Sequence, residues 1–376
     1  MPTQPWPAPT RTLCCALTVV LAACTPRGLP LELSPLRPGG GVLPGGATGP
    51  MGSGAEPPLP DHYALVGGQV VGLGPAEVEV QGGRVVAVGL ADPSVARIDA
   101  TGRWITAGVI DSHVHLAYLP EAEALAAGGV AGAVDLAAPV AFFEAELPLP
   151  VALAGPMVTT VGGYPTRSWG AAGYGHEVGS VEEARAAVRD HAERGARLIK
   201  VPVGGSPALS EPELVAIVEE AHALGLPVAA HAIDEAEVLQ AARVGVDVLA
   251  HTPPRPLSEA ALEAWRGRAV ISTLSAFGGV ETLRALREHG VEVLYGTDFG
   301  NTRARGISAA ELGLLLDAGL DGPAILAACQ ADPAARWSFP DLGAVEVGAR
   351  AHLLLLDADP ALDPMSLAAP LRVLRP

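Results

Sequence analysis

Lysine occurs once in this chain, at Lys200, and the other 23 of its 24 basic residues (24 − 1) are arginine. Arginine can supply a positive charge anywhere, but it does not lose its proton in proteins, whereas a buried lysine amine can do so and react. An amine at the end of a strand can add CO₂, and the resulting carbamate is a carboxylate that can bridge two divalent metals. The isolation of Lys200 therefore favours a chemical role over the chance survival of a surface lysine.

Histidines and one carboxylate could supply further metal ligands of the types that zinc and similar divalent ions prefer. His113 and His115 are one residue apart, which puts both imidazoles on the same face of an extended strand. A single histidine could equally be a packed core residue, so the shared position of the whole set is what indicates a site. The expected ligands, each within or at the end of a predicted strand, are His113, His115, Lys200, His231, His251 and Asp298. The helical histidines His191, His222 and His289 are expected to be solvated.

Residues in the predicted loops could contact a substrate. Arginines there would suit a substrate carboxylate, although surface solvation is the alternative for each of them. Asn301 is the only asparagine in the chain and lies three residues past Asp298, so it is expected to touch the substrate or to support the ligands. The candidate substrate-binding residues are Tyr164, Arg167, His176, Asn301 and Arg303.

The candidate residues lie in a region where strand and helix patterns alternate, which predicts βα units and a parallel sheet. Eight strands are expected, at Ile105–His115, Ala131–Leu136, Val151–Val158, Leu198–Val203, Pro227–Ala232, Val246–His251, Ala269–Leu274 and Val291–Asp298. The clearest helices are expected at Ser180–Glu193, Glu211–Ala223, Asp234–Val244 and Gly279–His289. Eight such units are what a closed barrel requires, and in that fold the reactive groups lie at the C-terminal ends of the strands. A doubly wound open sheet is the alternative, but the chain has no glycine-rich phosphate motif to support it.

Short apolar runs broken by glycine flank this region on both sides and are typical of β-hairpins. The predicted fold class is therefore α/β. It comprises a (β/α)₈ TIM barrel over residues 105–340 and a small composite β-sandwich built from residues 62–104 and 341–376.

The first residues have the pattern of a targeting segment, with Arg11 before an apolar stretch that ends at Ala23. The sequence Leu21-Ala22-Ala23-Cys24 resembles the lipobox of bacterial lipoproteins. The resemblance implies removal of residues 1–23, lipidation of Cys24, and an extracytoplasmic protein anchored to a bacterial membrane, facing the periplasm or the cell surface. An ordinary secretory signal is the alternative. Residues 24–60 are rich in proline and glycine without periodicity, which predicts a flexible tether.

The net charge of −17 argues against nucleic acid or an anionic membrane surface as a partner. A small-molecule substrate is expected instead, with membrane contact only through the lipid, and a homo-oligomer is left open. With Cys14 and Cys15 removed and Cys24 lipidated, Cys329 would remain alone, so no disulfide is expected.

Several motifs make the chain resemble the amidohydrolase superfamily. They are Gly108-Val109-Ile110-Asp111-Ser112-His113-Val114-His115, the strand-end histidines, Tyr295-Gly296-Thr297-Asp298 and Leu342-Gly343-Ala344-Val345-Glu346-Val347-Gly348. Two further segments, Gly162-Gly163-Tyr164-Pro165 and Leu198-Ile199-Lys200-Val201, are most similar to the imidazolonepropionase-like and zinc prolidase-like branch. The resemblance spans residues 62–376. The chain departs from it at Tyr164, where prolidase-like relatives often have histidine, and at His352, which replaces a common aspartate.

The resemblance implies a metal-dependent hydrolase with two divalent ions, expected to be Zn²⁺. His113 and His115 would bind the buried ion with Asp298. His231 and His251 would bind the exposed ion, and carboxylated Lys200 would bridge the two. A hydroxide shared by the ions would attack an amide, a peptide of the X-Pro or N-acyl amino acid type, or a cyclic amide. Asp298 and His251 would be the catalytic residues, Asp298 as the proton shuttle.

Two alternatives stay open. The first is a mononuclear deaminase or imidazolonepropionase-type hydrolase of the same superfamily, in which Lys200 carries no carbamate. The second is a lipoprotein that binds a ligand without turnover. The number of metal ions bound per chain distinguishes the first alternative from the binuclear hydrolase.

Overall fold

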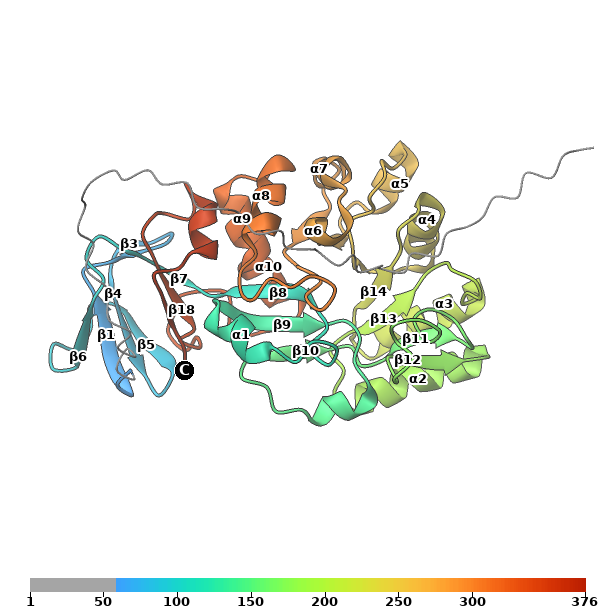
Figure 1. The fold of residues 1–376 in the computed structure, drawn as a ribbon, viewed down its shortest axis with the longest axis horizontal. Helices are drawn as coiled ribbons and strands as arrows, with labels where there is room; N and C mark the ends of the chain where they lie inside the picture. The colour runs from blue at the N-terminus through green and yellow to red at the C-terminus, as the bar shows by residue number, and fades with distance from the viewer. Residues whose placement is uncertain (1–58) are drawn as a thin grey trace, which may run out of the picture. The chain divides into compact units, whose positions relative to one another are not determined.

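The computed structural model describes residues 59–376, which belong to one unit that starts at Pro57. The predicted signal peptide, Cys24 and nearly all of the predicted tether lie outside the described residues. Strands and helices alternate along the middle of the described chain, from β8 to α9 (Figure 1). Within residues 59–376, no helix is long and apolar enough to cross a membrane.

Parallel strands form the middle of the fold. One sheet has the order β10-β9-β8, built from β8 (Val109–Val114), β9 (Val130–Asp135) and β10 (Val151–Leu153). A second sheet has the order β13-β14-β15-β16-β17, built from β13 (Ile199–Pro202), β14 (Val228–His231), β15 (Val248–Leu249), β16 (Ala269–Ile271) and β17 (Glu292–Leu294). Most residues of these strands are buried, as expected for parallel strands that are covered on both faces and read as continuous apolar runs.

Backbone hydrogen bonds connect the two parallel sheets at both edges. The N–H of Ser112 donates to the carbonyl of Tyr295 at 2.9 Å, which joins β8 to the end of β17. At the other edge, the N–H of Arg197 donates to the carbonyl of Leu153 at 3.0 Å, which joins β10 to the segment before β13. The strand ends that carry the candidate ligands are thereby held within one connected framework.

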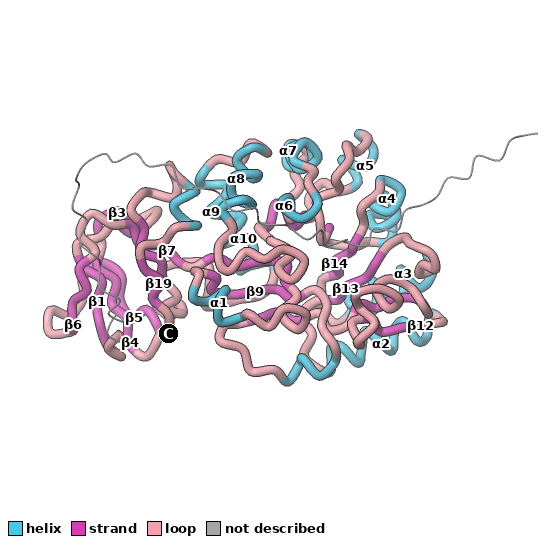
Figure 2. The backbone as a smooth tube through the Cα atoms, in the orientation of Figure 1, coloured by secondary structure: helices cyan, strands magenta, loops and turns pink. Residues whose placement is uncertain are grey.

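Helices follow most of these strands (Figure 2). They are α1 (Ala122–Ala127), α2 (Val181–Glu193), α3 (Glu211–Ala223), α4 (Glu235–Val244), α5 (Glu259–Ala264), α6 (Leu274–Phe277), α7 (Val280–Glu288), α8 (Ala309–Asp317), α9 (Gly322–Cys329) and α10 (Ala331–Arg336), with 3₁₀ turns at η1 (Val140–Glu144) and η2 (Pro364–Ala368). Capping side chains and a C-terminal glycine determine where several of these helices begin and end. Ser180 caps α2 by accepting from the N–H of Glu183, and Asp234 forms a capping box with Glu237 at the start of α4. α4 ends at Val244, and its C-cap residue Gly245 has a left-handed backbone with φ at 94°, which favours glycine.

Strands from both ends of the described chain share one sheet. This sheet has the order β19-β18-β7-β2-β3, built from β2 (Gln69–Val70), β3 (Gly74–Pro75), β7 (Trp104–Ala107), β18 (Leu353–Leu356) and β19 (Arg372–Leu374). A four-stranded sheet has the order β5-β4-β1-β6, built from β1 (His62–Val66), β4 (Glu77–Gln81), β5 (Arg84–Gly89) and β6 (Ala96–Asp99). Buried residues of both sheets, among them Leu65, Val78, Ile105 and Leu353, form one hydrophobic cluster.

Two of the predicted strands are each divided in the structure. The segment expected as Ile105–His115 forms β7 and β8, which belong to different sheets and are separated at Gly108. The chain passes so close to its neighbours there that a Cβ at position 108 would lie 2.8 Å from the Cβ of Ala131. The segment expected as Val151–Val158 is likewise divided, because Pro156 follows β10 and the next strand, β11 (Met157–Thr160), pairs with β12 (Gly175–Val178) instead.

Candidate metal centre

Three side chains from the ends of β8 and β17 form a compact group of donor atoms. The Nε2 atoms of His113 and His115 are 3.2 Å apart, and they lie 3.4 Å and 3.2 Å from Oδ1 of Asp298. Two donors bound about 2.1 Å from a tetrahedral zinc ion are about 3.4 Å apart, so these spacings suit ligands of one ion. All three residues are buried, and together they could hold a metal ion.

Lys200, His231 and His251 lie beside this group. The ring of His251, which follows β15, has its centroid 4.6 Å from that of His113 and 5.0 Å from that of His231. Lys200 in β13 is fully buried, and its Nζ has no hydrogen-bond partner in the described part of the chain. Lys200 interacts electrostatically with Asp298, His113 and His231, so the structure brings all six predicted ligand residues to one place.

Burial sets the charge of these groups. It lowers the pKa of His113 and His251 well below the ordinary value and that of His231 to about 3, so the rings are neutral at pH 7 and have a lone pair for a metal. Burial also lowers the pKa of Lys200 to about 7, against the opposing attraction of Asp298. At neutral pH a large share of this amine is therefore unprotonated, which is the form that adds CO₂.

Asp298 stays ionised at this position. Burial alone would raise its pKa, but His113, His115 and the amide of Asn301 outweigh burial and lower the pKa to about 2. Nδ2 of Asn301 lies 3.1 Å and 3.0 Å from the two carboxylate oxygens. The backbone at Asp298 is left-handed, with φ at 54°, a sparsely populated conformation for this residue type.

Other contacts orient the histidine rings. Nδ1 of His113 lies 2.8 Å from the carbonyl oxygen of Ala250 and donates to it, which leaves Nε2 unprotonated and facing Asp298. Nδ1 of His251 lies 3.2 Å from Oγ1 of Thr273, a residue that also has a left-handed backbone, with φ at 41°. These partners fix which nitrogen each ring presents to the centre.

Two buried carboxylates outside the predicted ligand set support the ligands. Oδ1 of Asp111 accepts hydrogen bonds from the N–H groups of His113 and Thr297, at 3.1 Å and 3.0 Å, and burial raises the pKa of Asp111 to about 7. Asp135 accepts from the N–H groups of Leu116 and Ala137, and burial raises its pKa to about 6. A carboxylate flanked by apolar residues inside a predicted buried strand, Ile110-Asp111 and Val134-Asp135-Leu136, was the signal that could have identified both.

Aromatic rings that were not predicted as a group line one side of the centre. Trp169 lies with its ring 5.2 Å from that of His115, and its Nε1 donates to the hydroxyl of Tyr164 at 2.8 Å. The ring of Tyr164 stacks on His231 at 5.0 Å. Phe277 adds a third ring, 4.1 Å from that of His251. The residues of the loop 161–174 and of α6 thus form an apolar wall beside the ligands.

The predicted substrate-binding residues divide into two groups. Tyr164 and Asn301 contact the ligand residues as described. Arg167 instead packs over Gly162, Arg303 is exposed near Glu121, and His176 faces His191, so within residues 59–376 the structure shows these three in no contact with the ligands.

The prediction that His191 is solvated is wrong. His191 is fully buried on α2, and burial lowers its pKa to about 4. Ala184, Ala187, Val188 and His191 form the buried face of this helix, with the i, i+3, i+4, i+7 spacing of an apolar face. That spacing was visible in the sequence.

Comparisons with known proteins bear on the fold. No protein-family model matches this sequence, and the curated proteins contain no match. Among solved structures, a prolidase in complex with N-methylphosphonate-L-proline is similar with a TM-score of 0.70 and 23% identity, over 84% of this chain and 98% of that chain. A putative prolidase from Bifidobacterium longum is similar with a TM-score of 0.71 and 24% identity, over 85% of this chain and 94% of that chain.

Phenylurea hydrolase B is similar with a TM-score of 0.68 and 19% identity, over 84% of this chain and 95% of that chain. At these identities the likeness establishes a common fold. This chain therefore shares the mixed α/β fold, with parallel sheets, of solved hydrolases of the amidohydrolase and prolidase type.

Proposed function

We propose that this chain is a metal-dependent hydrolase of the amidohydrolase superfamily that cleaves a C–N bond. Its substrate would be an amide, a peptide of the X-Pro or N-acyl amino acid type, or a cyclic amide. The observation that carries the proposal is the buried amine of Lys200, which has no hydrogen-bond partner among residues 59–376 and lies beside four histidines and an ionised Asp298. The solved prolidases and phenylurea hydrolase B that share the fold support a hydrolase of this kind.

The proposal includes a closed (β/α)₈ barrel over residues 105–340. The hydrogen bonds from Ser112 to Tyr295 and from Arg197 to Leu153 support closure, because they connect the two parallel sheets at both edges. A composite β-sandwich of residues 62–104 and 341–376 is supported by the hydrophobic cluster that the two outer sheets share. In barrel enzymes, the active site lies at the face formed by the C-terminal ends of the strands, and the candidate ligands of this chain lie at such strand ends.

The residues present fit two divalent cations, and the nitrogen-rich set suits Zn²⁺. His113 and His115 would hold one cation with Asp298, and His231 and His251 would hold the other. A carbamate on Lys200 would bridge them, which gives a role to an amine that otherwise lacks a partner in the described chain. When bound, such cations lower the pKa of water towards neutrality and polarise a substrate carbonyl.

The protein's own groups would move the proton and shape the pocket. Asp298 Oδ2 would accept a proton from the attacking water and pass it to the leaving nitrogen, since an ionised carboxylate is the required base. Asn301 would hold the carboxylate in place, and Thr273 would hold His251. Tyr164 and Trp169 would exclude bulk water and contact an apolar part of the substrate.

A mononuclear deaminase or imidazolonepropionase-type hydrolase is the second candidate. It is favoured by one observation: in the described chain, His113, His115 and Asp298 bring donor atoms within 4.8 Å of one another, whereas His231 and His251 do not join that set. Such an enzyme would hold one cation here and would need no carbamate.

Metal content and product release together test the proposal. We would measure metal in the wild type and in Lys200→Met, and assay the wild type with X-Pro dipeptides, N-acyl amino acids, lactones and amino-heterocycles. Loss of one cation in the variant, with a free amine or amino acid released by the wild type, supports the binuclear hydrolase. An unchanged metal content, with ammonia release from an amino-heterocycle or hydrolytic opening of its ring, supports the mononuclear candidate. No product from any of these compounds would count against the proposed hydrolase and favour a protein that binds a ligand without turnover.

A further inference from the structure

A second group of metal-ligating side chains lies where β12 meets α2, apart from the first centre. Nδ1 of His176 is 3.1 Å from Nε2 of His191, and the ring centroids are 5.2 Å apart. Asp190 precedes His191 on α2. Each of the three residues offers a donor atom within 4.8 Å of the others, and none of them belongs to the first ligand set.

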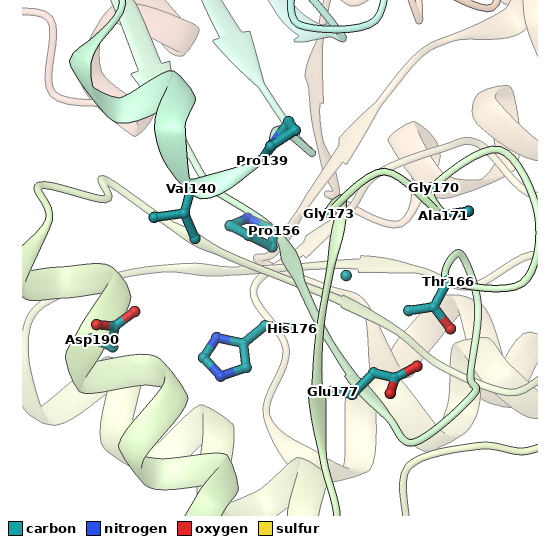
Figure 3. A pocket seen from close by; sticks show the side chains of 11 residues that line it. Pro139, Val140, Pro156, Thr166, Gly170, Ala171, Gly173, His176, Glu177 and Asp190 are labelled. Carbon is teal, nitrogen blue, oxygen red and sulfur yellow. The ribbon is translucent and has the colours of Figure 1, made fainter.

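This group borders a hollow of about 590 Å³ in the protein surface (Figure 3). His176 and Asp190 line the hollow, together with Thr166 and Glu177, so a cation could reach them from solvent. His191 is fully buried behind them. The site therefore has a protein floor and an open side, where water could complete the coordination of a cation.

The donor atoms are available in the described structure. The other ring nitrogen of His191, Nδ1, is buried without a hydrogen-bond partner in residues 59–376, and Nε2 contacts Nδ1 of His176. A cation bound between these two nitrogens would replace that contact. Arg194 donates to one carboxylate oxygen of Asp190, Oδ2, at 2.9 Å. The second oxygen lies outside that ion pair and can serve as a ligand.

We propose that His176, Asp190 and His191 form a second divalent-cation site that fastens β12 to α2. Two imidazoles and a carboxylate suit Zn²⁺, Co²⁺ or Ni²⁺. The 3.1 Å between the imidazole nitrogens is close to the separation of about 3.4 Å expected for two donors on one tetrahedral ion.

His176 lies close to the end of the loop that carries Tyr164 and Trp169. β12 begins directly after the loop 161–174, whose Tyr164 and Trp169 lie against His231 and His115 of the first centre. The other end of the loop leaves β11, which pairs with β12. A cation that fixes His176 to α2 therefore fixes the end of the segment that carries the aromatic wall.

The first experiment counts zinc in the purified full chain. His176→Ala is expected to retain one Zn²⁺ fewer per chain than the wild type after dialysis at equal free zinc, and Asp190→Asn is expected to bind that ion at least tenfold more weakly. Arg194→Gln is the matched control, because it removes the same ion pair as Asp190→Asn but leaves all three donors, and it should keep the wild-type count. His176→Gln with circular dichroism replaces His176→Ala if the latter fails to fold.

An equal zinc count in the wild type and in both His176 variants would overturn the site. This zinc count tests the second site separately from the proposed hydrolase, because the His176 variants leave every ligand of the first centre unchanged. Lys200→Met, in contrast, changes only the first centre.

The second experiment tests the connection to the loop. Arg167 is the only basic residue in residues 161–174, and it is exposed, so trypsin cleavage after it reports opening of this segment. Adding Zn²⁺ should slow this cleavage in the wild type at least about threefold more than in His176→Ala. Identical protection in the two proteins would show that no cation at His176 supports the loop.

Discussion

Asp111 and Thr297 are 186 residues apart in the sequence and are joined by two hydrogen bonds. The N–H of Thr297 donates to Oδ1 of Asp111 at 3.0 Å, and its hydroxyl donates to Oδ2 at 2.5 Å. Asp111 lies two residues before His113, and Thr297 directly precedes Asp298. The pair therefore sets the relative position of His113 and Asp298, two candidate ligands from segments that are far apart in the sequence.

Replacement of this carboxylate is expected to destabilise the fold. Asp111→Ala would leave the buried N–H groups of His113 and Thr297 without an acceptor, and each such loss costs about 1–3 kcal/mol. We expect the free energy of unfolding in urea to fall by about 3 kcal/mol. Thr297→Ser keeps both donors and should change it by less than about 1 kcal/mol. Similar values for the two variants would mean that Asp111 does not hold these segments together.

Lys200→Arg is expected to be nearly inactive, because a guanidinium keeps its charge and cannot form a carbamate. Lys200→Ala should regain part of its activity when acetate or another short carboxylate is added, since the missing group is a bridging carboxylate. Steady-state assays and elemental analysis of both variants check this. Full activity of the wild type with a single cation in this centre would contradict a role for the carbamate.

Asp298→Asn keeps an oxygen near the histidines but removes the base and its charge. Since general acid–base catalysis contributes about 10²–10⁴ in rate, kcat should fall by at least this factor while much of the metal remains bound. Asp298→Ala should be worse, because the ligand itself is lost. An effect mainly on KM would indicate lost substrate binding instead. If Asp298→Asn keeps more than about a tenth of the wild-type kcat, the proton is carried by another group, with His251 the first to test.

Stability should depend on pH through His352, which is buried among residues that leave its Nε2 unpaired in the described chain. Burial lowers the pKa of His352 to about 4, whereas a histidine in an unfolded chain titrates near 6.5. Between these values the unfolded state binds more protons than the folded state. The stabilisation is therefore complete above pH 6.5 and is lost as the pH falls towards 4, by about 3 kcal/mol.

His352→Gln cannot take up this proton, so its unfolding free energy should decline less between pH 6.5 and 4 than that of the wild type, by about 3 kcal/mol. Urea unfolding at several pH values measures both slopes. Parallel curves for the two proteins would mean that His352 takes up its proton as readily in the folded state as in the unfolded state.

We propose that the mature chain is anchored outside the cytoplasm through lipid on Cys24. Labelled fatty acid should enter the wild type expressed in bacteria and be absent from Cys24→Ser. A soluble mature form that begins at another residue would refute the anchor. A shortened chain that starts near residue 60 should keep its activity, because all candidate site residues lie in the described part.

Sequence periodicity accounts for much of what positions the centre. The alternation of His113 and His115 about a buried valine, and the strand patterns that end at His231 and His251, were sufficient to expect these ligands at one edge of the parallel strands. The contacts that orient them could not be expected in the same way. Asp111 meets Thr297 only because β8 and β17 become neighbours, and Trp169 reaches His115 only through the course of a loop without periodicity.

The division at Gly108 was missed for a related reason. Residues on both sides of this glycine have strand character, and only the pairing partners show that β7 belongs to one sheet and β8 to another. Pairing with β18, which lies near the end of the chain, is not encoded in any local pattern.

The pairing of β7 with β18 means that one sheet stays incomplete until the end of the chain is synthesised. Ala107 of β7 pairs with Leu353 of β18, which the ribosome adds 246 residues later (353 − 107). At about 5–20 residues per second, β7 and β2 wait roughly 12–50 s for the strand that completes their sheet. During this interval β7 has an open edge, which is where strands pair wrongly with other chains. A chain that stalls or is cut before residue 353 is therefore expected to aggregate or to require a chaperone, even though every candidate metal ligand has already been made.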